Sequence, residues 1–185
     1  VDEIVKVVTA IAPSFGGINL EDISAPRCFE IEEKLKAALR MPLMHDDQHG
    51  TAIVVAAGVI NALKVTSRAR AYVRMVINGA GAAGVAILHL CTKLGFRDIV
   101  LLDRQGIIGP GRTDIQGTYK EHIVKDSNPR RIHGSLADAL RGADVFVGVS
   151  AANCATEEMV ASMAPRPIVF ALANPVPEIM PDIAY

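Results

Sequence analysis

VRMVINGAGAAGVAILHLCTKLGFRDIVLLD, residues 73–103, has the pattern of a strand, a glycine-rich turn, a helix and a second strand. Val73 to Asn78 is a short apolar run whose β-branched residues suit a buried parallel strand. The following helix is expected to end at Gly95, and Ile99 to Leu102 supplies the second strand. One strand–helix–strand unit is therefore predicted here.

The turn within this unit fits the pattern G-x-G-x-x-G at Gly79, Gly81 and Gly84. In this pattern the glycines allow a tight turn, a close approach of the backbone to a pyrophosphate, and close helix–strand packing. Asp103 follows at roughly the 20-residue spacing expected for the acid that binds ribose hydroxyls. Glycine turns also occur for tight packing alone, but strand, turn, helix, strand and acid in this order favour a dinucleotide site.

Composition narrows the classes of partner. The 185 residues carry 19 basic and 20 acidic side chains, so no positive field favours nucleic acid or an anionic membrane. No run of about 18 apolar residues and no secretory pattern is found, so we expect a soluble, cytoplasmic protein with a small-molecule partner. Cys28, Cys91 and Cys154 are odd in number and far apart, which argues against a disulfide scaffold or a thiolate zinc site.

The rest of the chain continues the alternation of strands and helices. No hairpin signal or internal repeat is found, so an α/β fold with a doubly wound parallel sheet of the Rossmann type is predicted. A basic, polar stretch at 66–71 suggests a boundary between a metal-ligand segment, 1–70, and a dinucleotide-binding domain, 71–185. Helices are expected at 1–12, from 26, at 51–65, around 114–125, from 135 and from 156, and further strands at 15–20, 42–44, 144–149 and 167–173.

Several polar residues fall at the carboxyl ends of predicted strands, where an open α/β sheet binds its ligands. Carboxylates that converge without thiolates suit a hard cation such as Mg²⁺ or Mn²⁺. For any single acid, helix capping or solvation is the alternative, but two acidic pairs beside a dinucleotide unit favour a metal. The residues at strand ends are Glu21, Asp22, Asp46, Asp47, Gly79, Asp103, Ser150 and Asn174.

The motifs GGINLEDISAP, PLMHDDQHGTA, NGAGAAG, GVS and FALANPVPE together resemble malic enzymes of the bacterial malate oxidoreductase type. The resemblance covers nearly the whole chain. It implies metal-dependent oxidative decarboxylation of L-malate to pyruvate and CO₂ with reduction of NAD⁺ or NADP⁺. It also implies a homo-oligomer in the full-length protein.

By this resemblance Glu21, Asp22 and Asp47 are ligands of Mg²⁺ or Mn²⁺. Asp46 is then an acid beside the catalytic base, and Asn174 faces the substrate and the nicotinamide. The expected cofactor-binding residues are Asn78, Gly79, Gly81, Ala82, Ala83, Gly84, Asp103, Ser150 and Asn174.

The family's catalytic lysine and tyrosine match no residue here, so we expect a fragment that binds cofactor but turns over malate poorly alone. Asp103 favours NAD, whereas Arg104 could meet the 2′-phosphate of NADP, and NAD is the preferred expectation. Two alternatives remain open: a non-catalytic dinucleotide-binding module, and another two-domain dehydrogenase that acts on amino acids or folates.

Overall fold

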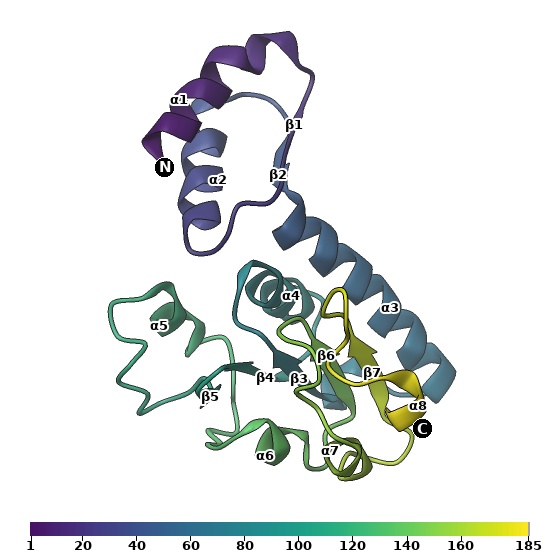
Figure 1. Cartoon of the computed structure of the whole chain (residues 1–185). Helices are drawn as coiled ribbons and strands as arrows, with labels where there is room; N and C mark the ends of the chain where they lie inside the picture. The colour runs from purple at the N-terminus through teal and green to yellow at the C-terminus, as the bar shows by residue number, and fades with distance from the viewer. Residues whose placement is uncertain (185) are drawn as a thin grey trace.

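The first 45 residues form a small lobe in which two helices lie beside two parallel strands (Figure 1). The structure is a computed structural model that describes residues 1–184. The two strands pair with Ile18 opposite Leu43, and Leu20, Ile31 and Leu35 form a buried apolar cluster in the lobe. The elements are α1 (Asp2–Ile11), the 3-10 turn η1 (Ala12–Ser14), β1 (Ile18–Leu20), α2 (Arg27–Ala38) and β2 (Leu43–His45).

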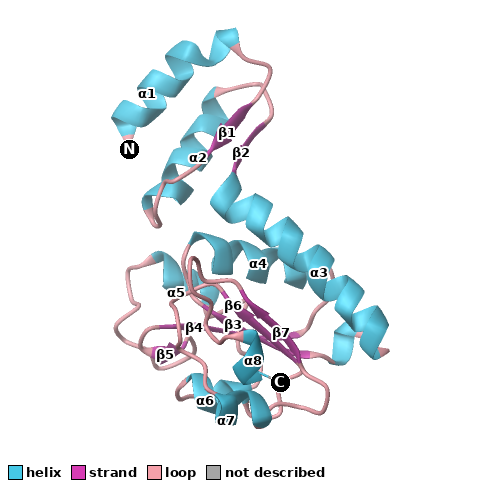
Figure 2. Cartoon of the chain, turned by 45° about the vertical axis from the view of Figure 1, so that its right-hand side comes forward, coloured by secondary structure: helices cyan, strands magenta, loops and turns pink. Residues whose placement is uncertain are grey.

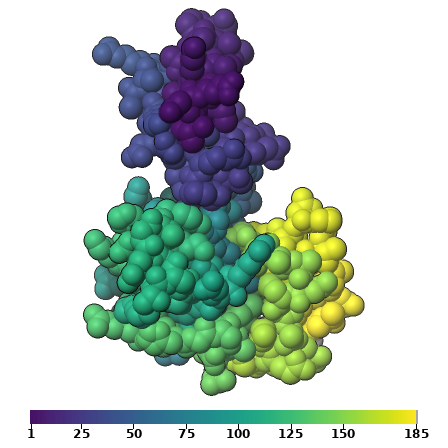
Figure 3. Space-filling model, turned by 60° about the vertical axis from the view of Figure 1, so that its left-hand side comes forward, coloured from purple at the N-terminus to yellow at the C-terminus, as the bar shows by residue number. Residues whose placement is uncertain are grey.

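The chain continues from β2 into a larger second lobe. Figure 3 shows the small lobe, in purple, above the larger one. The π-helical turn η2 (Asp46–Gly50) continues into α3 (Thr51–Thr66). This helix of 21 residues is longer than the sequence predicted, and its length and composition alone would suffice to cross a membrane. However, Val55, Val59 and Leu63 are buried in the core of the second lobe. The helix is therefore a packed part of that lobe.

The second lobe contains a five-stranded sheet in the order β5-β4-β3-β6-β7. Strands β3, β4, β6 and β7 are parallel, and β5 is antiparallel to β4. From the central β3 the chain proceeds first to β4 on one side and later to β6 on the other, so the order reverses between β3 and β6. The elements are η3 (Arg70–Tyr72), β3 (Arg74–Asn78), α4 (Ala82–Lys93), β4 (Asp98–Asp103), β5 (Gly106–Ile107), α5 (Tyr119–Ile123), α6 (Leu136–Leu140), β6 (Val145–Gly148), α7 (Glu157–Ala161), β7 (Ile168–Ala171) and α8 (Pro181–Ala184).

Helices cover both faces of this sheet, as Figure 2 shows. Successive residues of a strand point to opposite faces. Accordingly, Met75 and Ile77 of β3 pack in one core cluster with α3 and α4. Val76 packs in the other cluster with residues of α6 and α7. The predicted doubly wound α/β sheet is confirmed.

Two helix starts that the sequence predicted are held by side-chain caps. The hydroxyl of Ser135 accepts from the N–H of Asp138, whose carboxylate accepts in return from the N–H of Ser135. The hydroxyl of Thr156 accepts from the N–H of Met159. Such caps satisfy amides that have no partner inside the helix.

The region after β4 differs from the prediction. A hairpin was not expected, but β4 and β5 form one, in which Asp103 pairs with Gly106. Arg104 and Gln105 lack the usual Asn-Gly or Asp-Gly signal, and a bond from the N–H of Gln105 to the Asp103 carboxylate supports the turn instead. The polar helix predicted around 114–125 is shorter in the structure: α5 begins after the cap residue Thr118 and ends at Ile123. The boundary at residue 70 stays a prediction, although α3, which precedes it, packs with the second lobe.

Candidate functional site

The glycine-rich turn lies at the carboxyl end of β3, beside the point where the strand order reverses. Gly79 has a φ of +122°, and a Cβ there would clash with the carbonyl of Val149. A Cβ on Gly84 would clash with the carbonyl oxygen of Gly79. By contrast, a Cβ on Gly81 would meet nothing within 4 Å. The fold itself therefore requires Gly79 and Gly84, whereas Gly81 leaves space in front of α4.

A cavity of about 1040 Å³ opens in front of this turn. It is lined by the turn and by the carboxyl ends of β4 and β6, where sheets of this type bind dinucleotides. The structure brings most of the predicted cofactor residues to this cavity or to the one beside it. Asn78, Gly79, Gly81, Asp103 and Ser150 line the large cavity, Ala82, Ala83 and Asn174 line the adjacent one, and Gly84 is buried beneath the turn.

Asp103 is held by two cations. Both of its oxygens accept from Nη2 of Arg112 at 3.2 Å, and Oδ2 also accepts from Nζ of Lys120 at 2.6 Å. Burial alone would raise the pKa of Asp103, but the bond from Lys120 and the other partners outweigh it and lower the pKa below its ordinary value. The predicted ribose acceptor thus lines the cavity as a carboxylate that already binds Lys120, a second lining residue.

The adjacent cavity has a volume of about 540 Å³. Asp22, from the small lobe, and Asp47, from η2, both line it, together with Asn174 at the end of β7. Gly81 and Ser150 line both cavities. The dinucleotide crevice and the carboxylates are therefore neighbours.

Asp47 connects the two loops that carry the acidic pairs. Its Oδ2 accepts from the backbone N–H of Asp22 at 2.9 Å, and Asp22 has a φ of 59°. The fully buried ring of His45 lies with Nε2 3.5 Å from the same oxygen. Glu21 is exposed, and neither Glu21 nor Asp46 lines either cavity.

The donor atoms of the adjacent cavity agree in type with a hard cation. Two carboxylates line it, and no thiol or imidazole among residues 1–184 does. Oxygen ligands of this kind suit Mg²⁺ or Mn²⁺, which keep further positions for water and substrate. No three His, Cys, Asp or Glu side chains in the described part of the chain are grouped as a complete metal site. The lining thus fits a cation held by Asp22 and Asp47, and the role of Glu21 stays a prediction.

Two residues near the site were not predicted. The hydroxyl of Tyr119 donates to the carbonyl of Ala80 in the glycine turn, and its ring lies 5.1 Å from that of Phe29 in the small lobe. Glu178 is fully buried behind Ser150. A tyrosine in a polar helix carries no signal of such a role. Glu178 belongs to the motif FALANPVPE, but nothing in its spacing indicates which groups it contacts.

The site belongs to a recognisable family. Residues 48–181 match the family model for the malic enzyme NAD binding domain, and residues 1–36 match the model for the malic enzyme N-terminal domain. The chain belongs to the malic enzyme family. The resemblance found in the sequence motifs is confirmed, and the reading as a dehydrogenase of another family is set aside.

Individual malic enzymes are similar over the whole chain. It is 53% identical to the bifunctional malic/malolactic enzyme of Bacillus subtilis, with 100% of this chain and 45% of that protein covered. It is 50% identical to an NADP-dependent malic enzyme of Rhizobium meliloti, with 98% and 24% covered. The crystal structure of the NAD-dependent malic enzyme of Thermotoga maritima superposes with a TM-score of 0.95 at 45% identity, with 99% and 49% covered. The chain spans about half or less of the length of these relatives.

Proposed function

We propose that this chain supplies the dinucleotide site and the metal-binding carboxylates for oxidative decarboxylation of L-malate to pyruvate and CO₂, with reduction of NAD(P)⁺. The observation that carries the proposal is the meeting of the two cavities at Gly81 and Ser150. A hydride acceptor and a hydroxy acid bound at a cation must lie side by side for this reaction. The two adjoining cavities offer that arrangement.

Asp22 and Asp47 are the residues that would hold the cation. A divalent cation there supplies a Lewis acid for the hydroxyl of malate and for the negative charge that develops as CO₂ leaves. The bond from the N–H of Asp22 to Asp47 keeps the two loops together before anything binds. Asn174 lines the same cavity and would orient the substrate against the nicotinamide. Glu21 as a third ligand and Asp46 as an acid near the catalytic base remain part of the proposal.

We further propose NAD⁺ as the preferred cofactor. The carboxylate of Asp103 stays ionised at neutral pH, because its pKa is lowered, and it would repel a 2′-phosphate. Arg104 and Lys120 line the same cavity and would oppose this preference. Similar relatives use either cofactor, since the Thermotoga maritima enzyme is NAD-dependent and the Rhizobium meliloti enzyme is NADP-dependent.

Calorimetric titration tests the function. NAD⁺ or NADP⁺ is titrated first into the wild-type chain and into the Asp47→Asn variant. Malate is then titrated into each protein with and without Mn²⁺. We expect nucleotide binding by both proteins, and Mn²⁺-dependent malate binding by the wild type alone. Asp182→Asn is the matched control, because Asp182 is exposed and lines neither cavity. If the chain binds nucleotide but shows no Mn²⁺-dependent binding of malate, the metal site is refuted and the chain is only a dinucleotide-binding module.

A further inference from the structure

Glu178 is a buried acidic side chain without a cation. It follows β7, its residue exposure is 0%, and among residues 1–184 no Lys, Arg or His forms an ion pair with it. A buried carboxyl group is costly unless hydrogen bonds satisfy it. Its partners therefore indicate what this side chain does for the structure.

Those partners are backbone amides of two different loops. Oε1 accepts from the N–H of Ser150 at 2.8 Å, and Oε2 accepts from the N–H of Ala173 at 3.0 Å. Ser150 is the second residue after β6, and Ala173 is the second residue after β7. The hydroxyl of Ser150 also lies 3.5 Å from Oε1. One carboxyl group thus ties together the ends of two neighbouring strands.

The sheet leaves room for this carboxyl group at Gly148 of β6. A Cβ on Gly148 would clash with the carboxyl carbon of Glu178. The backbone of Glu178 is fixed as well, because its carbonyl accepts from the N–H of Ala155 at 3.0 Å. Gly148 therefore accommodates the carboxyl group of Glu178, and Ala155 anchors its backbone.

Both tied loops face the site, although Glu178 itself lines neither cavity. Ser150 lines both cavities, and Ala173 precedes Asn174 on the wall of the smaller one. Nδ2 of Asn78 donates to the hydroxyl of Ser150 at 2.8 Å, so the end of β3 joins the same network. At the other end of the large cavity wall, Asp103 is bound by Arg112 and Lys120 and has no contact with this network.

We propose that Glu178 is a positioning residue that sets the spacing between the Ser150 and Asn174 loops, and thereby holds the nicotinamide end of the dinucleotide. This inference rests on the proposed function. It assigns a role to the β6–β7 side of the site alone. The adenosine end beside Asp103 is independent of Glu178.

The test compares NAD⁺ with ADP-ribose, which lacks the nicotinamide, in titrations of the wild type and Glu178→Gln. Glutamine keeps the shape but presents a donor to one of the two amides, so one bond to a carboxylate is lost. Since the spacing of the two loops is then no longer fixed, affinity for NAD⁺ should fall about tenfold, which corresponds to about 1.4 kcal/mol. Affinity for ADP-ribose should change less than about twofold, because ADP-ribose lacks the nicotinamide that the two tied loops would hold.

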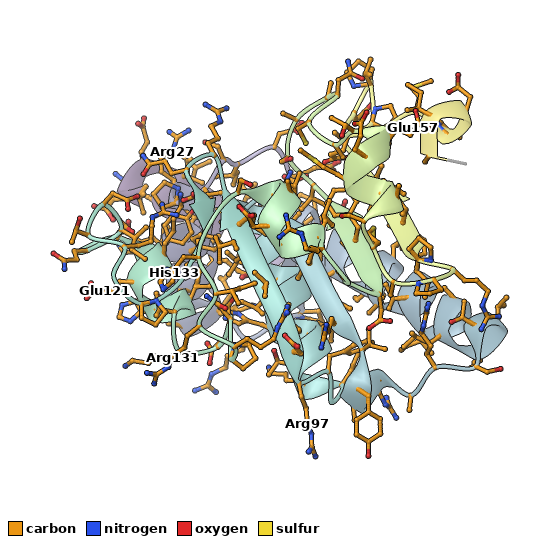
Figure 4. All side chains as sticks on the ribbon, turned by 90° about the horizontal axis from the view of Figure 1, so that it is seen from below. Arg27, Arg97, Glu121, Arg131, His133 and Glu157 are labelled. Carbon is orange, nitrogen blue, oxygen red and sulfur yellow. The ribbon has the colours of Figure 1, made fainter. Side chains whose placement is uncertain are left out.

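Glu157→Gln is the matched control, since Glu157 is exposed and lies in α7, where Figure 4 labels it. A purely structural role for Glu178 would lower both affinities together, and this result or an unchanged NAD⁺ affinity would overturn the proposal. If the wild type binds neither compound, the proposed function fails instead.

A measurement on the wild type covers the case in which the variant does not fold. NAD⁺ should slow amide hydrogen exchange at Ser150 and Ala173 more than ADP-ribose does, because the nicotinamide would hold the two loops that Glu178 ties. Equal protection by the two compounds would contradict the role of Glu178. Arg97 and Arg131, exposed and directed outward in Figure 4, lie on parts of the chain that should show no difference.

Discussion

The two lobes differ in how much of their structure is held by a core. The small lobe has a buried cluster of three apolar residues, and its helix α1 has no buried residue. The second lobe has large apolar clusters on both faces of its sheet. Nevertheless, Asp22 comes from the small lobe and reaches Asp47 at the junction. The second lobe presents the cofactor crevice, and the small lobe, with its smaller core, contributes a carboxylate to the adjacent cavity.

Leu35→Ala should cause the largest loss of stability, and this loss should be confined to the small lobe. Leu35 is fully buried in the small core, and removing such a side chain costs about 2–5 kcal/mol. Amide exchange should accelerate across residues 1–45, while ADP-ribose binding persists. Leu101→Ala removes an equally buried leucine from β4 and should abolish binding. If Leu35→Ala also abolishes ADP-ribose binding, the lobes form one cooperative unit.

Two glycines of the turn should respond differently to substitution, because Gly84 supports the fold and Gly81 faces the cofactor cavity. Gly84→Ala places a Cβ against the Gly79 carbonyl, so α4 must shift. The free energy of unfolding, measured in urea, should fall by about 1–3 kcal/mol, and nucleotide binding should be lost. Gly81→Ala should leave unfolding unchanged, because a Cβ there meets nothing within 4 Å, yet weaken nucleotide binding. Equal stability losses in the two variants would contradict this division.

Asp103→Asn tests the electrostatic network on the cofactor side of the second lobe. The pKa of Asp103 is lower in the folded state than in the unfolded state, where it is about 4. The contribution of Asp103 to stability is therefore complete above the unfolded-state pKa and is lost as the pH falls through the folded-state pKa. We expect the variant to lose about 1–2 kcal/mol of unfolding free energy at pH 7. The difference from wild type should shrink as the solution becomes strongly acidic. The control is Asp182→Asn, and a pH-independent difference would rule out the linkage.

Tyr119→Phe should have the smallest effect, at the contact between the lobes. It removes the bond to the Ala80 carbonyl, about 0.5–1.5 kcal/mol, but keeps the ring beside Phe29. Nucleotide affinity should weaken several-fold, because Ala80 lies within the glycine turn. Tyr72→Phe, at an 87% exposed residue, supplies the control. An unchanged affinity for Tyr119→Phe would show that the turn does not depend on this hydroxyl.

The sequence predicted the second lobe well because its signals are local. The apolar strand before Gly79, the cap at Ser135 and the acid at the end of β4 can each be recognised within a few residues. The hairpin after Asp103 was missed because a side-chain bond to Gln105, rather than a turn dipeptide, supports it. Local patterns therefore define the framework on which the site is built.

The fine structure of the site depends on contacts between distant residues. Asp103 meets Arg112 and Lys120 because the intervening loop folds back, and no spacing rule gives that result. Glu178 acquires its partners only when β6 and β7 pair and Gly148 leaves space. The candidate ligands Asp22 and Asp47 could be named from their strand ends, but the bond between them follows from the junction of the lobes.

The pairing order of the strands has a consequence for synthesis on the ribosome. Strands β1 and β2 are separated by about 20 residues, so the contact between them is local in sequence and can form early. Strand β3 sits at the centre of the large sheet, yet its partner β6 begins at Val145, and β7 at Ile168. Contacts so distant in sequence form late. One edge of β3 therefore stays unpaired on the nascent chain until β6 has been synthesised, and this is the interval in which a chaperone would be needed.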